Sequence, residues 1–354
     1  MEYDIKNDLK KLISMSGVSG FEKPVGEAIQ ALWQPLVNEV SFSKVGSLHA
    51  LKKGDCADKP CPKILLAAHM DAIGLMVTKV IDGFIRFDQV GGIREVILPG
   101  QPVLVHGVDT LPGVVVKPPD SLLPPELAQK VTPMSYLWVD VGLDAETVAE
   151  KVKPGDVISF AQEPLELSKD TISGHSLDNR ASVMALTVCL QELQKLSHNW
   201  DVWAVATVME EVTFAGAKTS PISIRPDIAV AVDVTFAKSV GTTDHETVPL
   251  GKGVAVGWGP NLHPKLFEKF KEVAEHFEIP YSKEVMPEHS YTDAIPMQVA
   301  AEGIPTMLLS VPLRYMHNAV EVVSVKDIQR TGHLLAQFIA SLEADYLDTL
   351  VWDE

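Results

Sequence analysis

Histidine and acidic residues follow several apolar segments of this chain, and their types are those that bind divalent metal ions. Two histidines and three carboxylates are borderline to hard ligands that suit zinc, cobalt or manganese. A bare cluster of carboxylates would repel itself in a cleft, and divalent ions would remove that repulsion. The residues that we predict to bind metal are His69, Asp178, Glu211, Asp233 and His317.

A pair of metal ions is the arrangement that this ligand set favours. One carboxylate can bridge two ions, and Asp178 is the natural candidate for that position. Two ions about 3.5–4 Å apart can polarise a carbonyl group and lower the pKa of a bridging water toward about 7. The chemistry that these residues indicate is therefore attack of an activated water on a carbonyl carbon.

Two further motifs would support such a site. In the His-x-Asp motif, Asp71 can accept a hydrogen bond from the second ring nitrogen of His69 and thereby orient the imidazole. Glu210 and Glu211 are adjacent, and we expect both at the end of a strand, where neighbouring side chains point to opposite sides. One of them would then bind metal, and the other would act as a general base within hydrogen-bonding reach of the water.

Each of these features also has an ordinary explanation when it is taken alone. A single His-x-Asp motif is usually a polar surface pair, and adjacent glutamates are usually solvated charges. An aspartate at the end of a strand is often a helix cap or a turn residue. The metal-site interpretation gains its weight from the combination, because these residues follow several apolar segments that can end at one edge of a sheet.

The elements that must position these residues alternate along the chain. Unbroken apolar runs predict buried strands over 64–68, 202–208, 228–232 and 305–311. Apolar residues at helical spacing predict helices over 181–196, 264–277, 293–302 and 324–342, with Ser324 as an N-cap. Such alternation is typical of an α/β fold with a doubly wound, mostly parallel sheet flanked by helices. Ligands bind such a sheet beyond the carboxyl ends of its strands, where the predicted residues stand.

The middle of the chain has a different pattern of residues. Between about 72 and 165, short β-rich segments are separated by Gly, Asp and Pro turns. We therefore predict a catalytic α/β domain over 1–70 and 166–354, interrupted by an inserted, small, β-barrel-like domain over 71–165. The length of 354 residues fits two domains at about 150 residues each.

Composition excludes several functional classes. The 30 basic and 47 acidic residues give a net charge of −17, which argues against nucleic-acid binding and against a polybasic membrane-binding surface. We find no signal peptide and no apolar run long enough to span a membrane.

The three cysteines suit a reducing compartment, so we expect a cytoplasmic protein. Cys56 and Cys61 lack the second ligand pair of a zinc ribbon, and we expect free thiols in a surface loop.

The order of the short motifs resembles one enzyme family over almost the whole chain. The segments AAHMDAIGLMV, SLDNRAS, MEEVTFAGA, VDVTFA, SYTDAIP and RYMHNAVEVVS are similar to those of the tetrahedral (TET-type) metalloaminopeptidases, which include glutamyl and deblocking aminopeptidases and proteins once labelled cellulases. The chain departs from the usual family pattern at 213–215, 290–291 and 318–319, and in a KPPD segment. None of these departures removes a candidate metal ligand.

The resemblance implies a division of roles. One ion would be held by His69, Asp178 and Asp233, and the other by Asp178, Glu211 and His317. Glu210 would be the general base, Asp71 would orient His69, and the peptide bond between Asp178 and Asn179 would be cis. Thr292 and Asp293 would line the substrate site.

The resemblance also implies a fold of the zinc-exopeptidase type and an assembly. The inserted β-domain would form a dimer, and dimers would associate into a hollow tetrahedral dodecamer. The predicted function is a two-metal aminopeptidase, with zinc or else cobalt or manganese, that removes N-terminal residues from short peptides through a metal-bridging water. The alternatives are a non-catalytic paralogue that assembles without cutting and a glycoside hydrolase, which would need two facing carboxyl groups and no metal.

Overall fold

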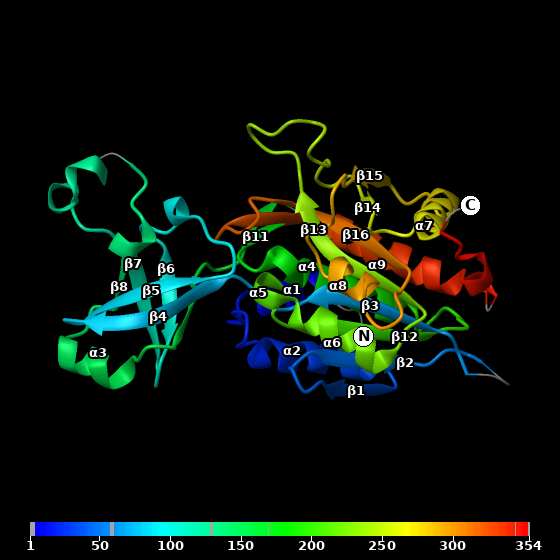
Figure 1. Ribbon diagram of the computed structural model, residues 1–354, viewed down its shortest axis with the longest axis horizontal. Helices are drawn as coiled ribbons and strands as arrows, with labels where there is room; N and C mark the ends of the chain where they lie inside the picture. Colours follow the sequence, from blue (N-terminus) through cyan, green and yellow to red (C-terminus); the bar gives the residue numbers. More distant parts are fainter. Residues whose placement is uncertain (1–3, 57–59, 128–129, 169, 344, 353–354) are drawn as a thin grey trace.

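The computed structural model describes residues 4–56, 60–127, 130–168, 170–343 and 345–352. Strands of these residues form one large sheet with helices and one closed barrel, and the two lie next to each other along the longest axis of the molecule (Figure 1). The predicted combination of an α/β sheet with a β-barrel is therefore confirmed.

Parallel strands form the centre of the large sheet. In the described part of the chain, four neighbouring strands run parallel, in the order β12 (Asp201–Thr207), β3 (Lys63–His69), β13 (Ile228–Phe236) and β16 (Thr306–Arg314). Their residues are buried almost without interruption, as expected for strands that are covered on both faces. The predicted parallel sheet is correct for this centre, which carries the polar residues of interest.

Antiparallel strands extend the sheet on both sides of this centre. On one side are β2 (Leu48–Lys52) and β1 (Glu39–Phe42), and on the other are β17 (Glu321–Ser324), β11 (Thr171–Gly174) and β10 (Leu165–Ser168). Two more strands, β14 (Val254–Trp258) and β15 (Tyr281–Val285), pair parallel to each other, and β14 pairs antiparallel with β16. The sheet is therefore mixed, with short strands that the sequence patterns did not predict.

Helices cover both faces of the sheet. One group packs around α4, which contacts β3, β13 and β16; it comprises α1 (Ile5–Ile13), α2 (Lys23–Trp33), α4 (Leu177–Glu192), α7 (Pro264–His276) and α9 (Val325–Ala340). A second group contacts β12, β13 and β16; it comprises α6 (Ala215–Ile224) and α8 (Ala294–Gln298) (Figure 1). Among the described helices, none has both the length and the apolar character that crossing a membrane requires.

Around the candidate site, three predicted ends of strands or helices differ from those in the structure. Asp233 does not follow its strand, because β13 pairs with β16 as far as Phe236 and Asp233 lies within it. Glu210 and Glu211 are not on a strand; they begin the short helix α5 (Glu210–Thr213) after Met209 adopts a left-handed conformation, with a φ of 56°. Helix α4 begins at Leu177 rather than 181 and contains the cis peptide bond between Asp178 and Asn179 that the resemblance implies.

Two other predicted helices differ only at their ends. The segment predicted over 293–302 is helical only over Ala294–Gln298, and Asp293 is its N-terminal flanking residue. Ser324 is the N-cap residue of α9 as predicted, although its side chain makes no capping hydrogen bond. Short 3₁₀ helices occupy Gln34–Leu36, Glu95–Ile97, Asp120–Leu122, Pro125–Leu127, Met134–Tyr136 and Tyr346–Thr349.

The barrel has an apolar interior of its own. Its strands, in closed order, are β4 (Gly74–Ile81), β5 (Phe84–Val90), β8 (Trp138–Asp140), β7 (Thr110–Val116), β6 (Pro102–His106) and β9 (Val157–Phe160). Alternate residues of these strands are buried together, for example Leu75 with Val77 and Val103 with Val105. Helix α3 (Ala145–Lys151) packs against β4. The barrel core is therefore separate from the core of the sheet.

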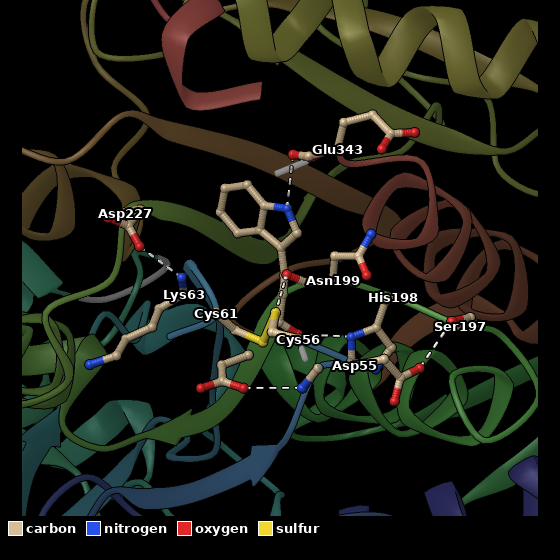
Figure 2. Close-up of a disulfide and its surroundings, with 12 residues drawn as sticks. Asp55, Cys56, Cys61, Lys63, Ser197, His198, Asn199, Asp227 and Glu343 are labelled. Atoms are coloured by element: carbon tan, nitrogen blue, oxygen red, sulfur yellow. Dashed lines mark hydrogen bonds between the residues drawn. A yellow bond between two sulfur atoms is a disulfide. The ribbon is translucent and has the colours of Figure 1, made fainter. Parts of the chain in front are cut away.

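A disulfide joins Cys56 to Cys61 (Figure 2). The prediction of two free thiols was wrong, because tertiary contacts bring the two ends of this loop together: the Asp55 N–H donates to the His198 carbonyl and the Lys63 N–H to Asp227 Oδ2. Their Cα atoms are 5.7 Å apart, within the usual disulfide range. The third cysteine, Cys189, is free and buried. Cysteine usage therefore does not support a reducing compartment.

Candidate metal centre

The residues predicted to bind metal come from separate elements and meet at one edge of the sheet. His69 is the last residue of β3, Asp233 lies near the end of β13, and Asp178 is in the first turn of α4. Glu211 is the second residue of α5, shortly after β12, and His317 lies in the turn that follows β16. Because the central strands are parallel, their carboxyl ends meet at one edge and bring these residues together.

His69 is at the centre of one half of the cluster. Its Nε2 atom lies 3.2 Å from Asp178 Oδ1, 3.8 Å from Glu210 Oε2 and 3.8 Å from Asp233 Oδ1. The imidazole is 2% exposed, so these carboxylates surround a group that solvent barely reaches.

His317 is at the centre of the other half. Its Nε2 atom lies 3.5 Å from Asp178 Oδ2 and 3.4 Å from Glu211 Oε2. The two carboxylate oxygens of Asp178 therefore face two different imidazoles, Oδ1 toward His69 and Oδ2 toward His317. That position between the halves is the one that a bridging ligand would need.

The donor atoms are close enough to share an ion. In the part of the chain that the structure describes, two sets of three have ligand atoms within 4.8 Å of one another: His69 with Glu210 and Asp233, and His69 with Asp178 and Glu211. Imidazole nitrogen and carboxylate oxygen suit zinc, cobalt and manganese. The residues present therefore fit a divalent metal, and Glu210 lies nearer to the first set than the predicted ligand division assumed.

The electrostatics of the cluster point the same way. Burial, reinforced by nearby carboxylates, raises the pKa of Glu210 to about 10 and that of Glu211 to about 8. Burial also acts to raise the pKa of Asp178, but hydrogen bonds from His317 and His69 outweigh it and hold that pKa below its usual range. The hydrogen bond to Asp178 raises the pKa of His317 to about 9. Burial and the crowding of carboxylates therefore disfavour the charged form of the two glutamates, and a cation bound among them would relieve that cost.

Asp71 fixes the start of α5. Its Oδ1 accepts the Glu210 N–H at 3.0 Å, its Oδ2 accepts the Glu211 N–H at 3.2 Å, and Oδ2 also accepts a hydrogen bond from the Ser19 hydroxyl. His69 Nδ1 lies 3.2 Å from the Asp71 backbone oxygen and 3.5 Å from Oδ1. The hydrogen bond from His69 therefore goes to the backbone oxygen of Asp71, with the carboxylate nearby, and the Asp71 carboxylate positions both glutamates.

Glu321 has a supporting position that sequence reasoning missed. Its Oε2 accepts the backbone N–H of Asp178 at 3.1 Å, and its Oε1 accepts the backbone N–H of His317 at 3.0 Å. The side chain is 2% exposed. A signal was present, since Glu321 is an acidic residue that begins the otherwise mostly apolar strand β17, but that strand is only four residues long.

A cavity of about 810 Å³ opens beside the cluster, and His69, Asp178, Glu210, Glu211, Asp233 and His317 all line it. Thr292 lines this cavity as well. Asp293 is not among the lining residues; it is buried, and its Oδ2 accepts a hydrogen bond from Thr207 Oγ1 at 2.5 Å. Phe214, Ser290 and Tyr291, where the chain departs from the family pattern, also line the cavity.

The chain is similar to known aminopeptidases over nearly its whole length. A model of the M42 glutamyl aminopeptidase family matches residues 46–334. The chain is 33% identical to a lysyl aminopeptidase from Pyrococcus furiosus, over 95% of this chain and 96% of that protein. Among solved structures, a TET aminopeptidase from a marine-sediment thaumarchaeote superimposes with a TM-score of 0.92, at 27% identity, over 98% of this chain and 99% of that one. The TET1 peptidase from Pyrococcus horikoshii, described as able to assemble into a tetrahedron or a large octahedral shell, gives 0.83 at 29% identity, over 96% and 100% of the two chains.

Proposed function

Because the chain belongs to the M42 glutamyl aminopeptidase family, we propose that it is a two-metal aminopeptidase that removes N-terminal residues from short peptides. The family supports a peptide hydrolase, and the metal pair and the mechanism are the proposal. The observation that carries it is the position of Asp178, whose two oxygens lie 3.2 and 3.5 Å from the imidazoles of His69 and His317. A bridging carboxylate is what a pair of ions would need there.

The proposed ligands divide around Asp178. His69 and Asp233 would share one ion with it, and Glu211 and His317 would share the other. When bound, divalent ions supply Lewis acidity that polarises the scissile carbonyl and lowers the pKa of water. We propose zinc, with cobalt or manganese as alternatives, since these donors accept all three.

The remaining residues handle the proton and the substrate. Glu210 would accept a proton at its carboxylate from the attacking water and deliver it to the departing amine. Asp71 would hold Glu210 in place through the N–H groups at the start of α5 and would orient His69. The predicted substrate role stays with Thr292 and Asp293, of which Thr292 lines the cavity.

Turnover of aminoacyl-p-nitroanilides, with added zinc, cobalt or manganese, tests this function. We expect hydrolysis of substrates with a free amino group, none of their N-acetylated counterparts, and loss of activity on exhaustive chelation that added metal restores. Full activity after chelation would contradict the metal mechanism. Bound metal without any turnover would favour the non-catalytic paralogue, and release of sugar from cellulose without peptide cleavage would favour the glycoside hydrolase.

We further propose that the region over 71–165 mediates a dimer and that dimers build a larger closed shell. The TET1 peptidase, to which the chain is similar, can assemble into a tetrahedron or a large octahedral shell. Large apolar side chains are exposed on this region, among them Val96, Val108 and Leu122. Light scattering coupled to size-exclusion chromatography should give a mass of twelve chains for a tetrahedral dodecamer. A monomer at all concentrations would contradict the assembly.

The cytoplasmic location stays a prediction. It now lacks support from the cysteines, because Cys56 and Cys61 are joined in a disulfide. Cell fractionation, with alkylation of free thiols before lysis, tests the location and the disulfide together.

A further inference from the structure

The cavity beside the metal centre contains a second acidic group, Glu284 on β15, which is not one of the candidate ligands. The Thr235 hydroxyl donates a hydrogen bond to its Oε1. Its Oε2 is buried and has no hydrogen-bond partner among the described residues. The Ser310 hydroxyl is near enough to lower the pKa of this carboxyl group, but it does not reach Oε2 with hydrogen-bond geometry. A buried carboxylate oxygen without a donor is costly, so this atom is available to a ligand.

The position of Glu284 relative to the metal centre follows from β13. Asp233 and Thr235 are two residues apart on that strand, so both side chains point to the same face, with their Cα atoms about 7 Å apart. Glu284 is hydrogen-bonded to Thr235, and all three residues line the same cavity. Glu284 therefore lies beyond Asp233 along the strand, at a separation that one long side chain can span.

The walls of the cavity suit a long side chain with a charged end. Phe236, Met286 and Pro287 line it and offer apolar surface, which the stem of a lysine or arginine covers while its charged group remains polar. No lysine or arginine is among the described residues that line the cavity. Lys283, the neighbour of Glu284, lies 4.0 Å from the centre of the Trp258 ring, which does not line this cavity.

A second carboxylate, that of Glu288, lines the cavity under different conditions. Glu288 is exposed to solvent, and its Oε2 already accepts a hydrogen bond from the Tyr291 hydroxyl at 3.1 Å. Exposed charges are screened by water and contribute little to binding. Of the two acidic groups outside the metal cluster, Glu284 is therefore the one placed to select a substrate.

We propose that Glu284 selects substrates whose N-terminal residue has a basic side chain, because its unpartnered oxygen accepts the substrate's ammonium or guanidinium group. This inference rests on the proposed aminopeptidase function. Burial raises the pKa of Glu284, which is consistent with a pocket that lacks a cation until the substrate supplies one. An acidic substrate side chain would meet this carboxyl group with no lysine or arginine among the described lining residues to pair with it.

The test compares substrates whose N-terminal side chains carry a positive charge, no charge or a negative charge. The metal-loaded protein is assayed with lysyl-, norleucyl- and glutamyl-p-nitroanilide, since norleucine has the lysine stem without the ammonium group. We expect kcat/KM for the lysyl substrate to exceed that for the norleucyl substrate by about tenfold or more, as for a hydrogen bond to a charged group. The glutamyl substrate should be the poorest. In Glu284→Gln the lysyl-to-norleucyl ratio should fall by about tenfold, mainly through KM.

Glu288→Gln is the matched control, because it removes the same charge from the same cavity. Its lysyl-to-norleucyl ratio should remain within about threefold of the wild-type ratio, as expected for a solvent-screened charge. Equal effects of the two substitutions, or a wild-type protein that treats the lysyl and norleucyl substrates alike, would overturn the assignment to Glu284.

Binding separates this inference from the proposed function. Free L-lysine and L-norleucine can be titrated into the metal-loaded protein by calorimetry, which requires neither turnover nor a variant. Absence of hydrolysis with every substrate would defeat the proposed function, while tighter binding of lysine than of norleucine would still support the role of Glu284. Equal binding of the two amino acids would overturn that role even if peptides are cleaved.

Discussion

The barrel and the edge of the sheet bury opposite kinds of side chain. The barrel encloses apolar residues such as Val77, Val105 and Val139, whose burial alone favours the folded state. The edge of the sheet buries His69 and Asp178 together with further carboxylates. Burying charged groups is costly unless they are paired or bind a metal. The barrel interior therefore needs no ligand, whereas bound cations would lower the cost of the charges that are buried in the crevice.

The two regions meet at His317. A Cβ atom on Gly92, two residues after the end of β5, would lie 3.0 Å from His317 Nδ1. Ala319, two residues after His317, is buried within the barrel core. The barrel thus helps to hold one of the candidate ligands, and the comparison shows how an apolar region can position a charged one. The following substitutions and treatments test this contrast, in order of decreasing expected effect.

Glu210→Gln should have the largest effect. Loss of the general base is expected to lower kcat by about 10²–10⁴-fold with little change in stability. Steady-state kinetics on an aminoacyl-p-nitroanilide measures the loss. The matched control is Glu146→Gln, an exposed position on α3 beside the barrel, which should retain wild-type turnover. Full activity of Glu210→Gln would remove this residue from the mechanism.

Metal removal should destabilise the sheet region and spare the barrel. Ions present at about 100 times their Kd would add about 2.7 kcal/mol to the free energy of unfolding, so chelation should lower Tm accordingly. Hydrogen exchange followed by mass spectrometry should rise in peptides that contain His69, Asp178 and His317. Peptides from β4 and β5 in the barrel serve as the internal control. An unchanged Tm after complete stripping would argue against the crevice as a metal site.

Glu321→Gln should weaken metal binding through the ligands that Glu321 positions. Glutamine has one acceptor oxygen, so it cannot accept both backbone N–H groups that the carboxylate now binds. We expect metal affinity to fall about 10–100-fold, as is typical for residues that orient metal ligands. Competition with a chromogenic chelator measures the affinity directly. Wild-type affinity in this variant would show that the contacts are dispensable.

Gly92→Ala should have the smallest effect of these. The added methyl group would press on the His317 ring, and because the imidazole is on a surface turn and is partly exposed, it can shift rather than unfold the protein. We expect a loss of metal affinity of about threefold at a nearly unchanged Tm. A large drop in Tm with unchanged affinity would instead indicate that the glycine matters for barrel packing alone.

Much of this architecture could be predicted because local patterns carry it. The apolar runs that become β3, β12 and β16 predict buried strands, and polar residues at their ends predict a crevice. The turn-rich segment between them predicts the β-region. The short strands β1, β10 and β17 have too few residues for a pattern to stand out.

Other features were decided only by the tertiary structure. Glu210 and Glu211 leave the strand for a helical turn because Asp71, about 140 residues earlier, accepts their N–H groups. The Cys56–Cys61 disulfide forms where contacts to His198 and Asp227 close the loop, and Glu284 gains its position through Thr235. Residue types and strand ends are local properties that a sequence displays directly. Which buried polar atoms find partners depends on contacts between distant segments, and only the folded chain determines those.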